Sequence, residues 1–423
     1  MSGQIEGLVG LAKELKRLGH TTELVTAFGD ALLNNDRLVL AERDDALLVG
    51  KVRRIGSILV NLVRRAKFVD IIHLNLPTPA FAILGDIVQQ LVDTPVVVGF
   101  EAHLAETSQP LQLPGIWNSP GFYLPRLLVN NNLTARCTWH RTSRYIVSSQ
   151  HQAKELHRLG FPPARISVLP TVIDIDKLQP LDRINARRQL NLPEGQLIAY
   201  VGHYHHVKGV DVLIEAFGRV VRDRPDCHLV LAWSGLGDPR PIARAAKELG
   251  VDDHVIQLGR VPIGTIISAV DVLALPYRYT MGQNAYPALM LEAMALGVPM
   301  VTSDLPLLEE LLEHERTALL VLPNDASALA WGISRLVENK TLAKEMAAKQ
   351  RRLVAERLNP EEIAKQYVRI YQQVCTGETA VLQSSRREQE LRPTAFRRTK
   401  RGVGKPQGTE YCDAIAAVPR EDP

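Results

Sequence analysis

Residues 275–299 read Leu275-Pro-Tyr-Arg-Tyr-Thr-Met-Gly-Gln-Asn-Ala-Tyr-Pro-Ala-Leu-Met-Leu-Glu-Ala-Met-Ala-Leu-Gly-Val-Pro299, which combines the end of a strand, a loop and an apolar helix. The loop contains Gly282, and the helical pattern is predicted to begin near Ala285. The first N–H groups of a helix have no partner within it, so they can bind an anion such as a diphosphate. The stretch therefore predicts an anion site where a strand is followed by a helix.

Glu292 lies two turns into this predicted helix. A carboxylate can accept hydrogen bonds from two sugar hydroxyls, as it does in ribose recognition by dinucleotide-binding folds. The alternative is a solvated glutamate on the surface of a core helix. We favour ligand binding because Leu289, Met290, Leu291 and Met294 predict a buried helix, and a buried carboxylate needs a partner.

A second stretch, Tyr200-Val-Gly-His-Tyr-His-His-Val-Lys-Gly-Val-Asp-Val-Leu-Ile-Glu-Ala-Phe217, repeats the order of strand, loop and helix. The strand is predicted to end at Gly202, Lys208 lies in the loop, and Gly209 opens the helix. A lysine beside a helix start can neutralise a phosphate as a point charge. Basic loops are often only solvated, so this pattern is less specific than the first.

Short β-branched runs alternate with amphipathic stretches over most of the chain. The predicted strands are 22–26, 69–74, 95–100, 145–148, 166–170, 197–201, 228–232, 255–258, 272–276, 299–302 and 318–322. Several are apolar on both faces, as parallel strands covered by helices are. The pattern predicts an α/β protein with two Rossmann-like, doubly wound domains.

The length of 423 residues is too great for one hydrophobic core, which also favours two domains. Pro180 and Pro193 flank a polar helix at the predicted join, and Asn359-Pro360 is a good helix start. Hydrophobic periodicity stops after Thr376. The predicted organisation is an N-terminal domain at 1–177, a C-terminal domain at 178–357, a helix at 358–375 that crosses back to the first domain, and a disordered basic tail at 376–423.

The composition, with 46% hydrophobic and 23% charged residues, is typical of a soluble globular protein. We find no apolar run of about 20 residues and no signal-peptide pattern. The four cysteines lack zinc or redox spacing, which predicts free thiols in a reducing compartment such as the cytoplasm. Residues 384–408 contain eight of the 50 basic residues and only two of the 46 acidic ones. The basic charge therefore belongs to the tail and does not indicate nucleic-acid binding.

The two stretches together resemble glycosyltransferase family 4, a family of retaining enzymes with the GT-B fold. That family has Gly-Arg, then Lys-Gly, then Leu-Ile-Glu-Ala-Phe at the first place, and Glu-x7-Glu before Ala-Met-Ala-x-Gly-x-Pro at the second. The resemblance covers roughly residues 3–375, with further matches at Gly3-Gln-Ile-Glu6 and Val69-Asp-Ile-Ile-His73. It implies transfer of a sugar from a nucleotide-sugar donor, held by the C-terminal domain, to a hydroxyl acceptor on the side of the N-terminal domain.

The resemblance also implies roles for individual residues. Lys208 would hold the donor diphosphate beside Gly202 and His203, and Glu292 would hold the ribose. The backbone at Gly259 would lie near the base. The loop that faces the sugar and phosphates would comprise Gln283, Asn284, Ala285 and Tyr286.

Four departures from the family pattern bear on catalysis. The family's arginine is His203 here, which carries a charge only when protonated. The first Glu of Glu-x7-Glu falls at Asn284, which can hydrogen-bond a sugar but cannot stabilise a cationic transition state by charge. Counted from Pro95, the position of the family's catalytic histidine falls on Glu101, and we assign the role to His103, two residues further on, with a structural histidine as an equal alternative. The family's first strand would precede Gly3, so we expect the N-terminal sheet either to lack it or to receive it from an upstream segment.

Two further patterns have competing explanations. His203, His205 and His206 could bind a metal, but no carboxylate or cysteine accompanies them at ligand spacing. The family needs no metal, so we expect no cofactor. Residues 46–69 contain six basic residues, no acidic residue and an apolar stripe. This pattern predicts either a helix packed on the sheet or one that docks on anionic lipid, which would suit a lipid-linked or polysaccharide acceptor.

The alternatives to a glycosyltransferase are a catalytically impaired GT-B protein that binds or acts as a scaffold, and a sugar-nucleotide epimerase of the same fold. Neither the sugar, the base nor the acceptor is evident from the residues.

Overall fold

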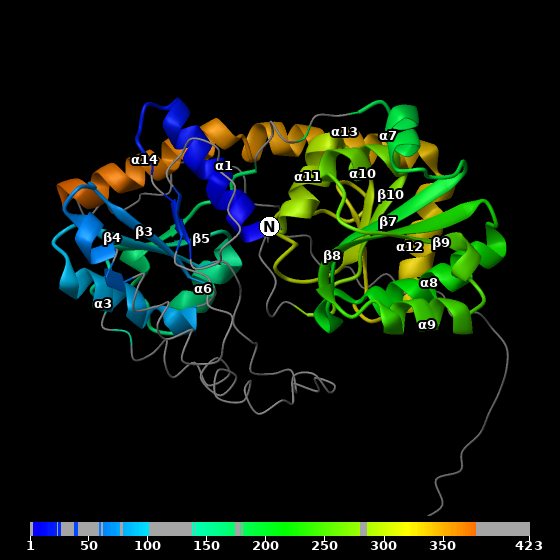
Figure 1. Cartoon of the computed structure of the whole chain (residues 1–423), viewed down its shortest axis with the longest axis horizontal. Helices are drawn as coiled ribbons and strands as arrows, with labels where there is room; N and C mark the ends of the chain where they lie inside the picture. The colour runs from blue at the N-terminus through cyan, green and yellow to red at the C-terminus, as the bar shows by residue number, and fades with distance from the viewer. Residues whose placement is uncertain are drawn as a thin grey trace, which may run out of the picture. The chain divides into compact units, whose positions relative to one another are not determined.

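The computed structural model describes residues 3–22, 24–26, 38–40, 59–60, 62–76, 79–100, 138, 140–173, 178, 181–279 and 286–377. These residues belong to one compact unit, residues 1–380, which contains two larger parallel β-sheets (Figure 1). Among these residues, no helix is both long enough and apolar enough to span a bilayer. Of the cysteines described, Cys227 is buried, Cys375 is exposed, and neither forms a disulfide.

The larger sheet has six parallel strands in the order β12-β11-β10-β7-β8-β9. The strands are β7 (Gln196–Tyr204), β8 (Cys227–Gly237), β9 (Val255–Leu258), β10 (Val272–Leu275), β11 (Met300–Ser303) and β12 (Leu319–Val321). Along β7, Leu197 and Ala199 pack into one hydrophobic core, and Ile198 and Tyr200 pack into another. Both faces of the strand are therefore buried, which explains its continuous apolar sequence.

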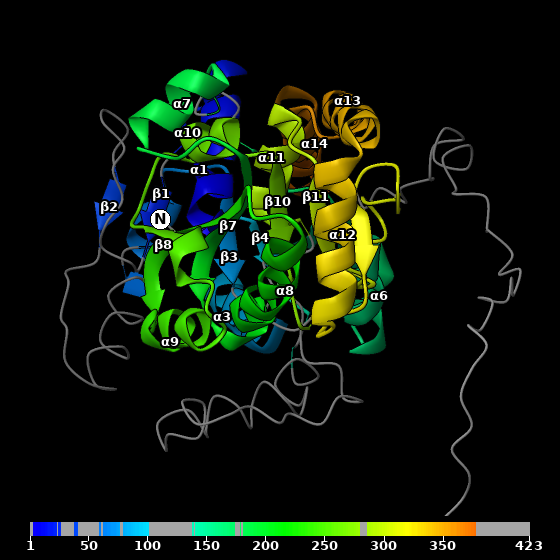
Figure 2. The ribbon, with the colours of Figure 1, turned by 90° about the vertical axis from the view of Figure 1, so that its right-hand side faces the viewer.

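Helices cover both faces of this sheet, as the predicted doubly wound fold requires (Figures 1 and 2). The helices packed into one core are α7 (Arg183–Gln189), α10 (Ile263–Ala269), α11 (Ala288–Leu296) and α13 (Lys340–Arg357). The helices packed into the other are α8 (Val210–Asp223), α9 (Arg240–Glu248) and α12 (Ala326–Glu338). The prediction of α/β layers with parallel strands is confirmed.

The smaller sheet has four parallel strands in the order β3-β4-β5-β6. The strands are β3 (Ile72–Leu76), β4 (Val96–Phe100), β5 (Arg144–Val147) and β6 (Ile166–Val168), and α1 (Gly3–Arg17), α3 (Ile83–Leu91) and α6 (Gln150–Arg158) accompany them. Two more strands, β1 (Leu24–Thr26) and β2 (Leu38–Leu40), pair only with each other among the described residues. β3 is thus an edge strand in this part of the chain, and β2 was not predicted.

Helix α14 (Pro360–Thr376) lies at the end of the described chain and contacts elements from its beginning. Its start is as predicted: the Asn359 side chain accepts hydrogen bonds from the N–H groups of Glu361 and Glu362, and Pro360 occupies the first turn. The helix packs against α1, and the Tyr371 hydroxyl lies 2.7 Å from Nδ1 of His73 in β3. The tail predicted at 376–423 lies outside the described residues from residue 378 onward.

Two strands run further than predicted. β7 does not end at Gly202 but continues to Tyr204, and β8 extends to Gly237 rather than to Ala232. The reason is their mutual pairing, which continues from Gly202 opposite Trp233 to Tyr204 opposite Gly237 through a register shift. Such pairing depends on a partner some 30 residues away, so the local hydrophobic periodicity does not predict it.

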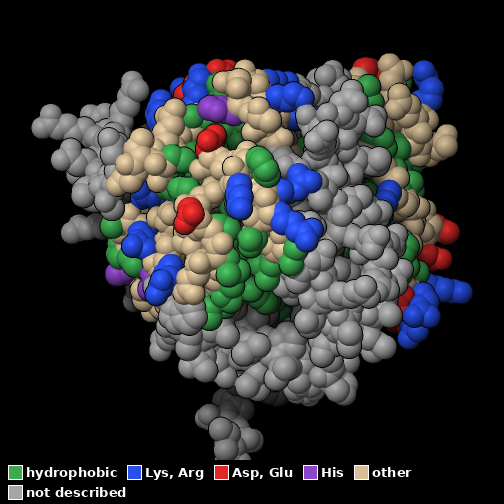
Figure 3. Space-filling model, turned by 60° about the vertical axis from the view of Figure 1, so that its left-hand side comes forward, with side chains coloured by type: hydrophobic (Ala, Val, Ile, Leu, Met, Phe, Trp, Pro, Cys, Tyr) green, Lys and Arg blue, Asp and Glu red, His purple; other side chains and the backbone are tan. Residues whose placement is uncertain are grey.

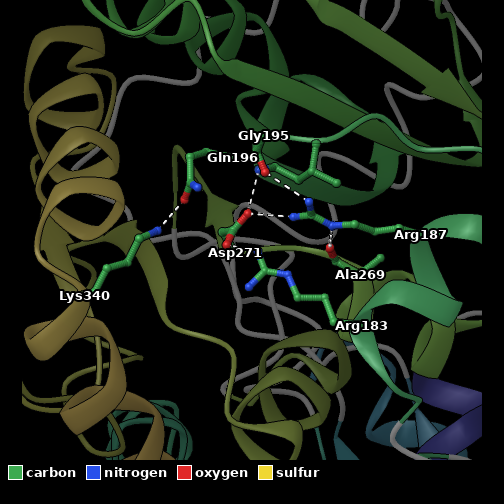
Figure 4. A network of polar contacts seen from close by, with 8 residues as sticks. Arg183, Arg187, Gly195, Gln196, Ala269, Asp271 and Lys340 are labelled. Atoms are coloured by element: carbon green, nitrogen blue, oxygen red, sulfur yellow. Dashed lines mark hydrogen bonds and ion pairs between the residues drawn. The ribbon is translucent and has the colours of Figure 1, made fainter.

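Asp271, directly before β10, organises a polar network at the amino ends of β7 and β10 (Figure 4). Its carboxylate accepts hydrogen bonds from the Leu197 N–H at 2.8 Å, from Arg187 at 2.9 Å and from Arg183. Arg187 also donates to the carbonyls of Ala269 and Gly195 at 2.9 and 3.0 Å. The network fastens α7 to the two central strands.

Replacing Asp271 is expected to destabilise the protein. Asp271→Ala should lower the free energy of unfolding by about 2–4 kcal/mol, because the Leu197 N–H loses its acceptor and the Arg187 charge loses its carboxylate partner in a half-buried site. Chemical denaturation would measure the change. The matched control is Asp226→Ala, which removes an exposed Arg224–Asp226 pair and should cost less than about 1 kcal/mol. Equal losses in the two variants would show that the network has no special role.

Candidate functional site

The strand order of the larger sheet reverses between β7 and β10. In doubly wound sheets, ligands bind outside the carboxyl ends of the strands at such a point. Lys208 follows β7, and Tyr277 and Arg278 follow β10, so both segments reach this same edge. The two stretches singled out in the sequence therefore meet where the topology favours a ligand.

The turn that carries Lys208 is short and closely packed. A single 3-10 turn, η5 (His206–Lys208), joins the end of β7 to α8, and Gly209 caps the helix with a φ of 67°. A Cβ on Gly209 would lie 2.0 Å from the Pro276 carbonyl oxygen. Only glycine therefore lets this turn approach the segment after β10, which confirms Gly209 as the residue that opens the helix.

Lys208 is half-buried in this turn and lies beside an aromatic ring. Its Nζ atom is 4.9 Å from the centre of the Tyr277 ring, in a cation–π arrangement. Burial lowers the pKa of its ammonium to about 8. At pH 7 the group is still mainly charged, and an anion bound beside it would offset the loss of hydration. A buried cation at the mouth of a doubly wound sheet is suited to holding a phosphate.

Arg278 connects the two segments of the site, and the sequence patterns did not identify it. Its backbone N–H donates to the Val207 carbonyl at 3.0 Å, and its guanidinium bonds Asp211 in the first turn of α8 and Asn324 beyond β12. The contacts hold the Lys208 turn against the end of β10. The signal that could have identified Arg278 is its position directly after β10, where the strand order of the sheet reverses.

His203 does not supply the charge of the family's arginine. Burial, together with the Lys208 and Arg260 charges, lowers its pKa below the ordinary histidine value. Its Nδ1 bonds the Ser234 hydroxyl, and Arg260 donates to the Ser234 carbonyl at 2.7 Å. Arg260 thus brings a fixed positive charge to the neighbourhood of His203, and the sequence patterns did not identify this residue either.

The other histidines of the loop are also disfavoured as cations. Burial lowers the pKa values of His205 and His206. Within the described ranges, no three His, Cys, Asp or Glu side chains are placed to share a metal ion. The prediction that the protein uses no metal stays a prediction.

Helix α11 begins later than predicted. Its first residue is Ala288 and Pro287 is its N-cap, rather than a start near Ala285. The delay has a steric reason, because proline disfavours helical conformation in the residue before it. Glu292 therefore lies in the second turn, half-buried, between the fully buried Leu291 and Ala293.

The remaining predicted residues fall into two groups. Gly202 has a φ of 148° at the β7 irregularity, Gly259 has open space where a side chain would project, and Tyr286 is 7% exposed and packs into the core beside α11. Their proposed contacts with the donor stay predictions. His103, Gln283, Asn284 and Ala285 lie outside the described residues.

Comparison with protein families decides what kind of protein has this architecture. The family model described as Glycosyltransferase Family 4 matches residues 1–177, and the one described as Glycosyl transferases group 1 matches residues 182–353. The chain belongs to glycosyltransferase family 4.

Curated relatives of this glycosyltransferase match it over part of their length. An uncharacterized glycosyltransferase of Methanocaldococcus jannaschii is 30% identical over 195 residues, which are 45% of this chain and 48% of that protein. The D-inositol 3-phosphate glycosyltransferase of Mycobacterium marinum is 30% identical over 213 residues, 48% of this chain and 43% of that protein. The chain spans about half the length of the curated relatives it matches.

Solved structures show the fold of this glycosyltransferase. Sucrose-phosphate synthase from Thermosynechococcus elongatus superposes with a TM-score of 0.71 at 21% identity, covering 88% of this chain and 93% of that one. An Anabaena protein solved with UDP and glucose superposes with a TM-score of 0.68 at 19% identity, covering 88% and 95%. The fold is GT-B, as the family resemblance implied.

Proposed function

We propose that this glycosyltransferase moves a hexose from a nucleoside-diphosphate sugar to a hydroxyl acceptor, with retention of anomeric configuration. The observation that carries the proposal is the position of Lys208, a buried ammonium at the point where the strand order of the donor-domain sheet reverses. Retention follows from the family resemblance alone. A polysaccharide or lipid-linked precursor is the acceptor class we propose.

The chemistry requires stabilisation of the departing diphosphate, because negative charge grows there as the sugar leaves. Lys208 supplies a positive charge, and α11, the helix that follows β10 in the chain, would offer its first N–H groups to the diphosphate. Glu292, in the second turn of α11, would accept hydrogen bonds from the ribose hydroxyls. Arg278 would keep Lys208 in place through the Val207 carbonyl and Asp211.

Uridine diphosphate is the first nucleotide to test, because the Anabaena structures contain UDP or UDP-glucose. The expected result is that UDP raises the melting temperature of the full chain by several degrees at 100 times its Kd. Guanosine and adenosine diphosphates serve as alternative nucleotides in the same assay. Absence of any shift with all three nucleotides would contradict the proposal.

A catalytically impaired binding protein of the same fold is the second candidate. The lowered pKa of His203 favours it, because the charge that the family places there is missing at neutral pH. Both candidates predict nucleotide binding, but only the enzyme releases UDP from UDP-glucose. Measurement of UDP release by the full chain therefore distinguishes them.

Peripheral contact with an anionic membrane and a cytoplasmic location complete the proposal. In the described part of the basic segment, Ala66 is in the core, while Phe68 is 86% and Val60 is 49% exposed. Arg64 and Lys67 are exposed nearby. Figure 3 shows one face of the molecule, on which Lys and Arg side chains border hydrophobic ones. Exposed apolar groups among basic ones suit anionic lipid. Failure of the protein to float with phosphatidylserine vesicles would contradict the proposed membrane contact.

A further inference from the structure

A cavity of about 60 Å³ lies in the N-terminal domain, between α1 and the sheet formed by β3 to β6. Its lining includes Gly7 from α1, His73 and Asn75 from β3, Gly99 from β4, and Tyr367 from α14. Since one water needs about 10–15 Å³ on this measure, the space holds several waters or part of a sugar ring. No predicted site residue lies in it.

The cavity contains a buried nitrogen that lacks a hydrogen-bond partner. Nδ1 of His73 is bonded to the Tyr371 hydroxyl at 2.7 Å, but Nε2 is buried and has no partner among the described residues. The ring centres of Tyr367 and Tyr371 lie 6.0 and 5.9 Å from the centre of the His73 imidazole, and this packing keeps the imidazole in one orientation. Buried polar atoms are nearly always hydrogen-bonded in native structures. A ligand group or water in the cavity would satisfy Nε2.

Gly99 provides the space that this nitrogen faces. A Cβ on Gly99 would lie 2.8 Å from Nε2 of His73 and 2.9 Å from Oδ1 of Asn75. Two polar atoms on β3 therefore converge over a glycine of β4, where any side chain would fill the opening. The arrangement is a small polar cradle built across two neighbouring strands.

The cradle is uncharged. No Asp, Glu, Lys or Arg is among the residues that line the cavity in the described part of the chain. Burial lowers the pKa of His73 to about 4, so its imidazole is neutral at physiological pH. A phosphate placed here would be buried without a counter-charge, at a high energetic cost. Hydroxyl groups, which both donate and accept hydrogen bonds, suit these partners.

The cavity is also close to the helix that we assign to donor binding, because one helix contacts both. Gly7, Leu8 and Leu11 of α1 line it, and α1 packs directly against α11, the helix that carries Glu292. Asn75 and Gly99 lie near the carboxyl ends of their strands, the end at which doubly wound domains bind ligands. One helix thus separates this cavity from the helix we assign to the donor.

We propose that the cavity binds an uncharged, hydroxyl-rich group, which is part of the acceptor. That this group belongs to the acceptor rests on the proposed function, whereas its binding in the cavity rests on the lining residues alone. The inference differs from expectation based on the relative named D-inositol 3-phosphate glycosyltransferase, because the portion of the acceptor held here would carry no phosphate.

Saturation-transfer NMR on the full chain tests the proposal with myo-inositol and D-myo-inositol 3-phosphate as probes, and with UDP as a separate ligand. Wild-type protein is expected to bind myo-inositol. Gly99→Ala fills the cradle and Asn75→Leu removes its polar atoms, so each should weaken myo-inositol binding by about tenfold or more. Binding of UDP should be unchanged, which also shows that each variant is folded. Asn185→Leu, at an exposed position of α7, is the matched control and should leave both ligands unaffected.

Several results would overturn the proposal. No binding of myo-inositol to the wild type would show that the cavity holds only water. Binding that persists in both variants would place the polyol elsewhere. A loss of affinity in both variants that is larger for the phosphate ester than for myo-inositol would contradict the uncharged character. Absence of UDP binding by the wild type, with variant-sensitive myo-inositol binding intact, would instead contradict the proposed function and leave the cavity assignment standing.

Discussion

Lys208→Met is expected to lower kcat/KM for sugar transfer by about 10²–10³-fold while leaving the fold intact. Methionine retains an apolar stem beside Tyr277 but removes the charge that would stabilise the departing diphosphate. Because the burial that lowers the pKa of Lys208 disfavours the charged form in the folded protein, removing the charge should not lower the free energy of unfolding. UDP release from UDP-glucose measures the rate, and denaturation measures the stability.

The charge state of Lys208 adds an independent readout. Its pKa of about 8 means that the ammonium is charged at pH 7 and loses its proton as the pH rises past that value. UDP affinity should therefore fall between about pH 7 and pH 9 in the wild type and stay flat in Lys208→Met. Lys247→Met, at an exposed position on α9, is the control and should keep the wild-type profile. Near-wild-type turnover in Lys208→Met would remove the central element of the site.

Glu292→Gln is expected to lower kcat/KM by about 10–10²-fold, because the amide binds ribose hydroxyls more weakly than a carboxylate does. The sharper test compares UDP with 2′-deoxy-UDP. The wild type should bind UDP more tightly by about tenfold or more, and Glu292→Gln should reduce this preference, since the two changes remove the same contact.

Two outcomes distinguish ribose recognition from a structural role for Glu292. Loss of affinity for UDP and 2′-deoxy-UDP in equal measure would indicate that the residue supports α11 rather than the nucleotide. Glu292→Ala should abolish turnover with retention of the fold, which circular dichroism would check. Glu248→Gln, exposed at the end of α9, should leave the preference between the two nucleotides unchanged.

The features predicted correctly depend on short stretches of sequence. The apolar run around Leu197 indicated a strand buried on both faces, and Asn359-Pro360 indicated the start of α14. In each case the sequence signal lies in residues within a few positions of one another. The delayed start of α11 is an exception at short range, since Pro287 imposes a local restriction that helical periodicity overlooks.

The features that were missed depend on partners far along the chain. Arg278 acquires its role through Val207 and Asp211, roughly 70 residues earlier. The continuation of β7 to Tyr204 requires β8 beside it. His203 is a poor cation because other segments bury it and place Lys208 and Arg260 close by.

The amino-acid sequence by itself determined the α/β class, the family, and the two strand–loop–helix stretches that contain Lys208 and Glu292, because periodicity and motif spacing are properties of contiguous residues. Only the tertiary structure decided that both loops reach the same edge of one sheet, that Lys208 is desolvated against Tyr277, and that His73 faces a polar space over Gly99. Burial and hydrogen-bond satisfaction are set by whichever segments pack together. Neither can be assigned until the strand order is known.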